Sequence, residues 1–263
     1  METRQIAEGS VDNFDQILTQ ELRCIPIATR SLEDIYLVGF PKSGNTWIQN
    51  LVCSAVFGTH SFYTPDSVVQ QLVPDVHTTK FYRRFREPSI FKTHDLPRPE
   101  YQRVVYILRD GRDAMVSYQH HLSALYGRTV DLGGMLQFGS GLFPCRWYQH
   151  VEIWLSNPFG ATMLIVKYED LKANAAKILA QICSFIGVER PKEFLSEIAA
   201  NAEFEKMQQR ERQQGWDNEQ WPKDAAFVRR GTIGGYRDEM PPDLQELFLQ
   251  QARSTLLKCG YAV

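Results

Sequence analysis

Residues 35–47, with the sequence Ile-Tyr-Leu-Val-Gly-Phe-Pro-Lys-Ser-Gly-Asn-Thr-Trp, constrain the fold of this chain more than any other segment. The first four are apolar and partly β-branched, which favours a short buried strand. Residues 39–45 form a tight turn, and residues 47–52 begin an amphipathic helix. A strand, a turn and a helix in this order point several backbone N–H groups and a positive helix end at one place. The segment therefore predicts a loop that binds phosphate or sulfate.

The turn departs at one position from the Walker pattern G-x-x-x-x-G-K-[ST]. Gly39, Gly44 and Thr46 match the pattern, but Asn45 stands at the lysine position and the loop's only lysine is Lys42. In a nucleotide triphosphatase the lysine reaches the β- and γ-phosphates, and the following Ser or Thr holds Mg²⁺. We therefore expect Lys42 over the outer end of a shorter, diphosphate-like group, and no metal site of that type. A Gly-Pro turn without a ligand is the simpler alternative, which the flanking strand and helix disfavour.

Residues 40–47 resemble the 5′-phosphosulfate loop of the sulfotransferases that use 3′-phosphoadenosine 5′-phosphosulfate (PAPS), and they are nearest to the soluble, cytosolic-type branch. This resemblance implies PAPS as the co-substrate. The loop residues that it assigns to PAPS are Lys42, Ser43, Gly44, Asn45, Thr46 and Trp47.

Length and composition favour one domain. The chain has 263 residues, which is enough for one sizeable core. It contains no Ser/Gly-rich linker, low-complexity run or repeat, so we expect a single domain over residues 1–263, with its core at about 33–260. The net charge of −2 argues against nucleic-acid binding. Two basic clusters, residues 80–86 and 228–231, either hold a small polyanion or are solvated faces.

The cysteines and the N-terminal sequence bear on the compartment. The five cysteines are scattered and never form a C-x-x-C pair, which indicates neither a disulfide framework nor a zinc site and favours a reducing compartment. The N-terminal residues show no basic stretch followed by an apolar one, and no window of about 18 apolar residues occurs. We therefore expect a cytoplasmic protein that does not bind membranes.

A second segment, residues 89–97, reads as a short strand that places Lys92 and His94 on the same face and Thr93 on the other. Parallel α/β sheets hold their ligands at the ends of such strands. A lone histidine is more often structural than catalytic. Here the segment resembles the Lys-Ser/Thr-His segment of the sulfotransferases, which implies that His94 is the general base and that Lys92 and Lys42 stabilise the developing charge.

The strand predicted for residues 103–108 runs into Arg109 and then into a helix that Asp110 or Gly111 caps. This resembles the second nucleotide motif of the family, which implies that Arg109 and Ser117 bind the 3′-phosphate of PAPS. A planar guanidinium and a hydroxyl suit a phosphate monoester. The alternative is a structural Arg–Asp pair with Ser117 facing solvent.

Glycines interrupt residues 122–145, and we expect there a loop that acts as a lid over the acceptor. His120 and His121 are not expected to bind a metal, because adjacent residues do not share a helix face and no Cys or carboxylate completes the set. Residues 58–89 and 122–146 are expected to line the acceptor pocket. Their aromatic and apolar residues favour a phenolic or lipophilic alcohol: Phe62, Tyr63, Phe81, Tyr82, Phe85, Leu125, Tyr126, Phe138 and Phe143.

Three later segments complete the resemblance. Residues 161–167 read as a strand, followed by Tyr168-Glu169-Asp170-Leu171 and a helix to residue 186. The likeness implies that Tyr168 contacts the adenine side of PAPS, and that Trp47 and Phe204 stack on the adenine. Ala202 stands where the family has a Thr, which removes a hydrogen bond worth about 1 kcal/mol. Residues 147–154 resemble a packing helix of the family.

Residues 227–237 resemble the last nucleotide segment of the family, which implies that Arg229, Arg230 and Gly231 clamp the 3′-phosphate. An exposed basic turn is the alternative. A final amphipathic helix is expected at residues 243–258. The C-terminal dimer motif of the family is not visible after Tyr236, so the sequence leaves the oligomeric state open.

These observations predict an α/β protein with a central parallel sheet flanked by helices and a phosphate loop of strand-loop-helix type. The predicted reaction is the in-line transfer of a sulfuryl group from PAPS to a hydroxyl, or an amine, of a small acceptor, with adenosine 3′,5′-bisphosphate as product and no metal ion. Two alternatives are kept. One is a phosphate-loop kinase of small molecules, and the other is a nucleotide-binding module without turnover.

Overall fold

The apolar runs of the sequence form four parallel strands of one sheet, in the order β4-β2-β5-β6. In the computed structural model, which describes residues 23–60, 63–215 and 221–263, these strands are β2 (Ile35–Gly39), β4 (Ile90–Thr93), β5 (Arg103–Leu108) and β6 (Thr162–Lys167). A separate antiparallel pair joins β1 (Ile25–Pro26) to β3 (Phe81–Tyr82). The predicted α/β class with a parallel sheet is confirmed.

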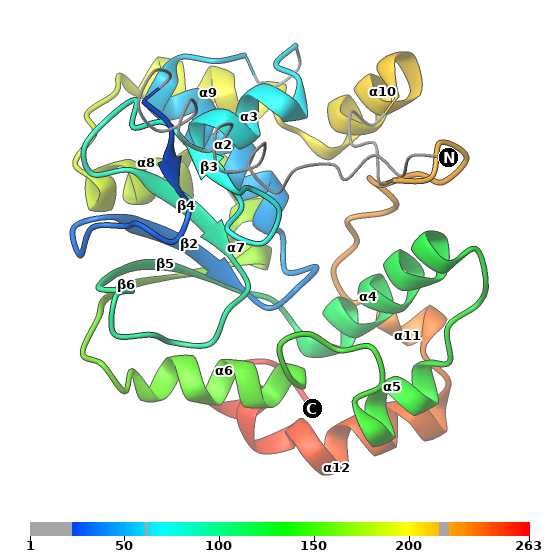
Figure 1. Ribbon diagram of the computed structural model, residues 1–263. Coiled ribbons are helices and arrows are strands. Elements are labelled where there is room, and N and C mark those ends of the chain that lie inside the picture. Colours follow the sequence, from blue (N-terminus) through cyan, green and yellow to red (C-terminus); the bar gives the residue numbers. More distant parts are fainter. Residues whose placement is uncertain (1–22, 61–62, 216–220) are drawn as a thin grey trace, which may run out of the picture.

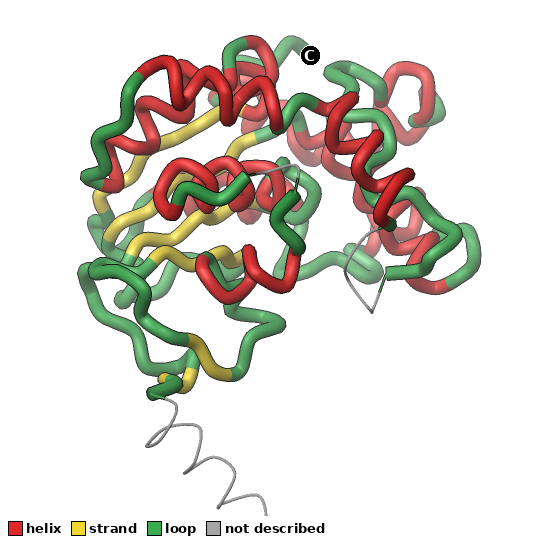
Figure 2. The backbone as a smooth tube through the Cα atoms, turned by 90° about the horizontal axis from the view of Figure 1, so that it is seen from above, coloured by secondary structure: helices red, strands yellow, loops and turns green. Residues whose placement is uncertain are grey.

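Alternate residues of β2 face opposite sides of the sheet, so each side has its own apolar cluster. Ile35 and Leu37 pack in one cluster, and Tyr36 and Val38 pack in the other. Helices cover both sides, as Figures 1 and 2 show. The first side carries α2 (Asn45–Phe57), α8 (Ala175–Ile186) and α9 (Lys192–Asn201), and the second carries α4 (Gly111–Tyr126), α6 (Trp147–Ser156) and α12 (Pro242–Lys258).

Five further helices complete the described chain. They are α3 (Asp66–Leu72), α5 (Leu132–Phe138), α7 (Tyr168–Ala173), α10 (Phe204–Gln214) and α11 (Tyr236–Glu239). No helix in the described part of the chain is both long and apolar enough to cross a membrane.

Two predicted elements have different bounds in the structure. The strand expected at 89–97 ends at Thr93, so His94 follows the strand instead of lying within it. The helix expected to run to residue 186 is divided at Asn174, whose backbone leaves the helical region (φ −155°) and whose side chain accepts a hydrogen bond from the Lys177 N–H. An Asn at a helix start satisfies an otherwise unpaired N–H group.

The lid predicted for residues 122–145 is wrong for most of that stretch. Helix α4 continues to Tyr126, and α5 follows after Asp131, whose carboxylate accepts hydrogen bonds from the N–H groups of Gly133 and Gly134. Leu132 and Met135 are buried in the second apolar cluster. The glycines at 133 and 134 therefore lie inside a capped helix and do not break it.

The connections after β2 and β5 position the site. The chain leaves β2 for α2 on one side of the sheet and leaves β5 for α4 on the other. Where neighbouring parallel strands send their connections to opposite sides, a crevice opens at their carboxyl ends.

Candidate active site

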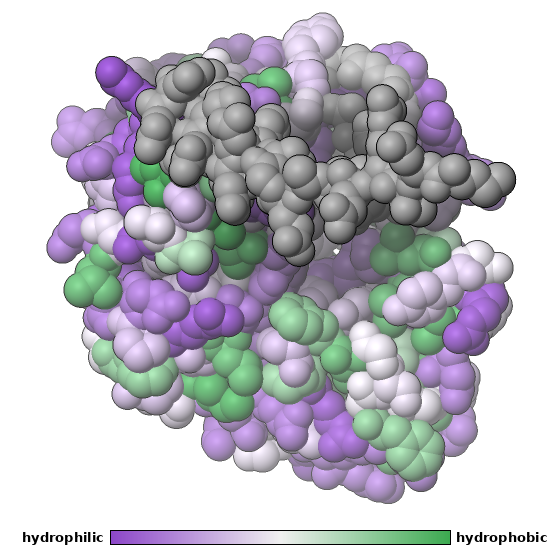
Figure 3. All heavy atoms as spheres, in the orientation of Figure 1, coloured by the Kyte–Doolittle hydropathy of each residue, from purple (hydrophilic) through white to green (hydrophobic). Residues whose placement is uncertain are grey.

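A cavity of about 1220 Å³ lies at the carboxyl ends of β2, β4 and β5. Figure 3 shows this face hollowed beside the part that carries α4 and α5. Ser43 lies in the loop without lining the cavity, and the side chain of Phe204 lies outside the described residues. The other predicted site residues all line it: Lys42, Gly44, Asn45, Thr46, Trp47, Lys92, His94, Arg109, Ser117, Tyr168, Arg229, Arg230 and Gly231.

The phosphate loop is held in a shape that requires its glycines. A Cβ on Gly39 would lie 2.6 Å from Asn45 Oδ1 and 2.7 Å from the Ile107 carbonyl oxygen. Gly44 has φ +102°, and a Cβ there would lie 2.8 Å from the ring of Tyr168. Lys42 itself has φ +66°, a conformation that costs a non-glycine residue about 1 kcal/mol or more. The fold therefore holds Lys42 in a strained conformation at the crown of the loop.

Two buried donors at the loop have no hydrogen-bond partner among the described residues. They are the hydroxyl of Ser43 and the Nε–H of Arg109. An unpaired buried donor is costly, because the group loses its hydrogen bonds to water. Arg109 lines the cavity, so a phosphate or phosphosulfate group bound at the loop would lie beside its guanidinium.

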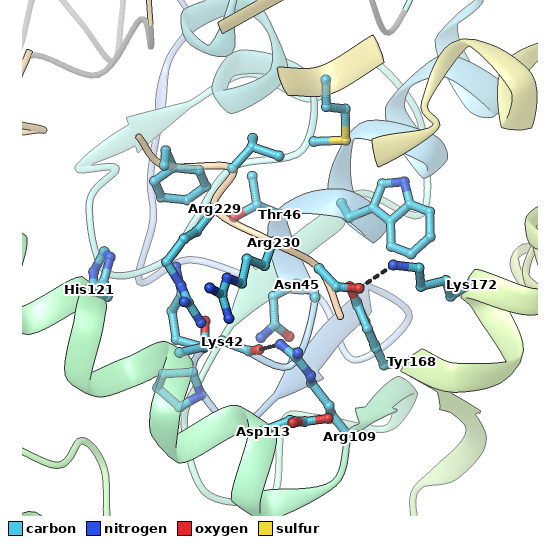
Figure 4. Close-up of a pocket in the computed structure, with 18 of the residues that line it drawn as sticks. Lys42, Asn45, Thr46, Arg109, Asp113, His121, Tyr168, Lys172, Arg229 and Arg230 are labelled. Carbon is cyan, nitrogen blue, oxygen red and sulfur yellow. Dashed lines mark hydrogen bonds between the residues drawn. The ribbon is translucent and has the colours of Figure 1, made fainter. Parts of the chain in front are cut away.

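Cationic side chains converge on this space (Figure 4). Lys42 from the loop, Arg109 from the end of β5, and Arg229 and Arg230 from a later segment reach it together. Burial, with Arg109, Lys92 and Arg229 nearby, lowers the pKa of Lys42 to about 7. The Lys42 ammonium lies 4.5 Å from the ring centre of Phe227. The site therefore concentrates positive charge that a bound anion would neutralise.

Arg109 links the phosphate loop to the later segment that carries Arg229 and Arg230. Its guanidinium donates to the carbonyl oxygens of Lys42 (2.9 Å) and Thr232 (3.2 Å), and it lies 4.3 Å above the ring of Tyr168. It does not pair with Asp110, which caps α4 and binds Arg112 instead (2.6 Å). Ser117 lines the cavity. The alternative of an Arg109–Asp110 pair is therefore wrong.

Arg229 and Arg230 share one carboxylate, that of Glu239 on α11. Arg229 binds it through two nitrogens (2.6 and 3.1 Å), Arg230 through one (3.2 Å), and His120 through Nε2 (2.7 Å). Burial acts to raise the pKa of Glu239, but the hydrogen bonds from Arg229 and His120 hold it below its usual value. Sequence reasoning did not identify Glu239, because nothing in its neighbourhood pairs it with the arginines nine and ten residues earlier.

The segment that carries the arginines is tied to α7 and to α4. The hydroxyl of Tyr168 (3.2 Å) and the ammonium of Lys172 donate to the carbonyl oxygen of Gly231. The carboxylate of Asp113 accepts from the N–H groups of Gly234 (2.7 Å) and Tyr236 (2.9 Å). These contacts fix the main chain of the segment that carries Arg229 and Arg230.

His94 has a defined tautomer. Its Nδ1 lies 2.7 Å from the carbonyl oxygen of Gly39, which only accepts, so Nδ1 carries the proton and Nε2 keeps a free lone pair. Burial, with Lys92 nearby, lowers the pKa of His94 to about 4, so the ring is neutral at physiological pH. A neutral imidazole with a free Nε2 is suited to accept a proton.

Helix α6 and the segment before β4 hold His94 in place. His150 Nε2–H donates to the backbone oxygen of His94 (3.2 Å), and Trp154 Nε1–H donates to that of Asp95 (3.0 Å). The backbone N–H of His94 donates to Nε2 of His77 (3.1 Å). The helix that the sequence assigned to packing thus also positions the candidate base.

Lys92 forms a buried ion pair with Asp75, at 2.8 Å. Burial acts to raise the pKa of Asp75, but Lys92 lowers it below its ordinary value. The main chain keeps the partners adjacent, because Val76 N–H donates to the Lys92 carbonyl and Lys92 N–H to that of Pro74. Sequence reasoning missed Asp75, which lies in a segment without a strand or helix pattern.

Trp47 is held at the far end of the loop. Its Nε1–H donates to the carbonyl oxygen of Ala202 (2.9 Å), and its ring meets that of Tyr168 edge to face at 5.8 Å. Position 202, where a hydroxyl was expected to be lost, therefore contributes its backbone oxygen to Trp47.

The residues around His94 differ from those predicted for the acceptor. Phe143 alone, of the predicted aromatic and apolar residues that fall within the described ranges, lines the cavity, and Phe62 falls outside those ranges. Tyr118 and Phe227 line it as well, together with the imidazoles of His77 and His121. The lining is aromatic as expected, but different residues provide it.

The two adjacent histidines of α4 have partners other than a metal. His120 binds Glu239, while the ring of His121 stacks on that of Trp221. Over the described ranges, no three His, Cys, Asp or Glu side chains gather as metal ligands would.

The fold and the site define the class of α/β proteins with a phosphate loop at the carboxyl edge of a parallel sheet. Residues 32–260 match the family model described as the sulfotransferase domain. The chain belongs to this family and is a sulfotransferase.

Proteins with similar sequences are sulfotransferases as well. Sulfotransferase 1E1 of Bos taurus is 24% identical, over 86% of this chain and 85% of its own length. Cytosolic sulfotransferase 13 of Arabidopsis thaliana is 27% identical, over 81% of this chain and 74% of its own.

Solved structures show the same fold. Mouse sulfotransferase SULT7A1 complexed with PAP superposes with a TM-score of 0.64 at 22% identity, covering 90% of this chain and 92% of its own. Retinol dehydratase, in complex with androsterone and the inactive cofactor PAP, has a TM-score of 0.64 at 20% identity, covering 87% and 82%.

Proposed function

We propose that the protein transfers a sulfuryl group from PAPS to a hydroxyl of a small acceptor and releases adenosine 3′,5′-bisphosphate (PAP). One observation carries this proposal. The free Nε2 of His94 and the ammonium groups of Lys42 and Lys92 line the same cavity as a loop with unpaired donors. The solved relatives that hold PAP support the choice of nucleotide.

The residues of the cavity suit this nucleotide. Ser43, Gly44, Asn45 and Thr46 would hold its 5′ end with main-chain and hydroxyl donors. Arg109, Ser117, Arg229, Arg230 and Gly231 would hold the 3′-phosphate, for which guanidinium groups are suited. Trp47, Tyr168 and Phe204 would contact the adenine. PAPS supplies the sulfuryl group itself.

The chain's own residues would then do two things. His94 Nε2 would accept the proton of the acceptor hydroxyl, since Nδ1 is already committed to Gly39. Lys42 and Lys92 would stabilise the negative charge that builds on the leaving phosphate and the sulfuryl oxygens. Asp75 holds Lys92 in position beforehand.

A phenolic acceptor suits the space beside His94. Phe143, Tyr118 and Phe227 offer ring surfaces there, and the His77 ring lies nearly parallel to that of His94 (10° between planes, 6.0 Å apart). Flat, aromatic-lined spaces favour flat apolar ligands. We also propose a single domain and a cytoplasmic location.

The proposal is tested by incubating the purified protein with PAPS and a panel of phenols and alcohols, and measuring sulfate esters and PAP. A parallel incubation replaces PAPS by ATP and Mg²⁺. Sulfate transfer without phosphate transfer supports the proposal. Phosphate transfer from ATP would establish the kinase, and tight PAP binding without any ester would establish the nucleotide-binding module.

Nucleotide affinity is expected to fall as pH rises above about 7. In the free protein Lys42 has a pKa of about 7, and a bound anion raises that pKa, so the complex binds more protons than its parts. The sign follows: loss of that proton weakens binding, by up to about tenfold per pH unit. Calorimetric titration of PAP between pH 6 and 9 measures it. Lys42→Met should remove this dependence, and its persistence in the variant would contradict the assignment.

Glu239→Gln is expected to tighten PAP binding by about two- to fivefold at low salt. The wild-type carboxylate pairs with Arg229 and Arg230, and a partly exposed charge interaction of this kind is worth about 1 kcal/mol or less. The gain should shrink at high salt, where such interactions are screened. Glu246→Gln, an exposed site on α12, is the control. Weaker PAP binding by Glu239→Gln would mean that the carboxylate instead positions Arg229 and Arg230 for the nucleotide.

A further inference from the structure

The mechanism leaves His121 on α4 without a role. Its ring lines the cavity, and Figure 4 shows it at the edge of the space that Lys42 and Arg229 enter. His94, Lys92 and Lys42 all lie close enough to influence its charge. His121 therefore belongs to the acceptor end of the cavity.

Aromatic contacts fix the orientation of the His121 ring. It stacks on Trp221 with centres 4.9 Å apart and 15° between planes, and Phe227 meets it edge to face at 6.2 Å. Tyr118 approaches from the same helix at 6.4 Å. A ring held on three sides presents one fixed edge to the cavity.

The two nitrogens of His121 have different environments. Nδ1 is buried and has no hydrogen-bond partner in the described part of the chain, whereas Nε2 is not among the buried unpaired atoms. A buried N–H without a partner is rarer in proteins than a buried lone pair without one. The favoured tautomer thus leaves the lone pair on Nδ1 and the proton on Nε2. Burial, with Lys42 and His94 nearby, lowers the pKa of His121 to about 3, so the ring is neutral.

His94 and His121 are therefore two neutral imidazoles of opposite tautomer. His94 offers a lone pair at Nε2, because its Nδ1–H donates to Gly39, and His121 offers an N–H at Nε2. A ligand that uses both must donate one hydrogen bond and accept another. The first group is the hydroxyl that receives the sulfuryl group.

We propose that the acceptor is a phenol with a second, hydrogen-bond-accepting group, and that His121 Nε2–H donates to that group. This rests on the proposed function, because it concerns the acceptor of the same reaction. His121 is then a specificity-determining residue. A site built to donate a hydrogen bond discriminates against an analogue that lacks the acceptor, since the donor is left unpaired.

Two phenols of similar shape test the proposal. 3-Hydroxyacetophenone carries a carbonyl oxygen, and 3-isopropylphenol carries a methyl group in its place. Their binding to PAP-saturated protein is measured by calorimetry in the wild type, in His121→Phe, which retains a ring to stack on Trp221, and in His121→Gln, which restores an N–H. His60→Ala, at an exposed site outside the cavity lining, is the histidine control.

The wild type is expected to bind the ketone about five- to tenfold more tightly, relative to the isopropyl phenol, than His121→Phe does. His121→Gln should recover part of this ratio, and His60→Ala should keep all of it. Because each ratio compares the same two phenols, their difference in acidity cancels. An unchanged ratio in His121→Phe, equal losses for both phenols, or no binding of the ketone to the wild type would each overturn the proposal.

This failure is distinguishable from failure of the proposed function. If the protein does not bind PAP or transfer sulfate, the saturation step and the ester assay fail first. If His121 has no such role, PAP binding and ester formation stay intact, and the substitution leaves the ratio between the two phenols unchanged.

Discussion

Replacing His94 by alanine is expected to reduce turnover by about 10²- to 10⁴-fold while PAP binds with nearly unchanged affinity. The reason is geometric. Nδ1 donates to the Gly39 carbonyl, so Nε2 is the nitrogen left to accept the acceptor's proton. The affinity is retained because the nucleotide contacts assigned here come from other residues. Steady-state sulfate transfer with saturating PAPS measures the first effect, and calorimetric titration of PAP measures the second.

Two further variants sharpen this test. His94→Gln keeps a donor toward Gly39 but offers a much weaker base, so its turnover should stay close to that of His94→Ala. His60→Ala, on an exposed site, should retain wild-type turnover. Turnover of His94→Ala within about threefold of the wild type would remove His94 from the base role.

Lys42→Ala and Arg109→Ala are expected to separate chemistry from nucleotide binding. Lys42 stands at the crown of the loop, where charge develops, so its loss should lower kcat by about 10²- to 10³-fold. Arg109 is assigned to the 3′-phosphate, and a hydrogen bond to a charged group is worth about 1.5–3 kcal/mol. Its loss should weaken PAP binding by about ten- to a hundredfold, with a smaller effect on kcat.

A second measurement tests the assignment of Arg109 to the 3′-phosphate. Adenosine 5′-phosphate lacks the 3′-phosphate, so Arg109→Ala should bind PAP more weakly while its affinity for adenosine 5′-phosphate changes little. Since Arg109 also donates to the carbonyls of Lys42 and Thr232, Arg109→Lys and a thermal unfolding curve control for misfolding. Arg98→Ala, half exposed and away from the cavity lining, is the matched control. Equal losses for both nucleotides would show that Arg109 acts only by holding the loop.

The local sequence pattern was sufficient to predict a residue's structural role where that role depends on neighbours in the chain. The strand at 103–108 appears as predicted, and of the two predicted caps, Asp110 and Gly111, the structure has Asp110. Both predictions succeed because β-branched runs and capping side chains act within a few residues. The turn at 39–45 was also predicted from its sequence, although the contacts that require its glycines come from Asn45 within the turn and from Ile107 and Tyr168, which are distant in the chain. By contrast, residues 122–145 were misjudged, because Asp131 caps a helix that the glycines appeared to exclude.

Partners that are distant in sequence could not be predicted. Asp75 beside Lys92, Glu239 beneath Arg229 and Arg230, and His150 behind His94 are joined only by the packing of separate elements. Likewise, the aromatic lining of the acceptor end was expected from composition, and the structure draws it from other positions, including Tyr118 and Phe227.

By itself, the sequence determined the phosphate loop, the strands and the family. These depend on short-range geometry and on sequence motifs. Only the tertiary structure decided the protonation of the site. The tautomer of His94 and the lowered pKa of Lys42 depend on burial and on groups that separate elements bring together. Burial and charge proximity are properties of the folded arrangement, and no segment of the chain carries them alone.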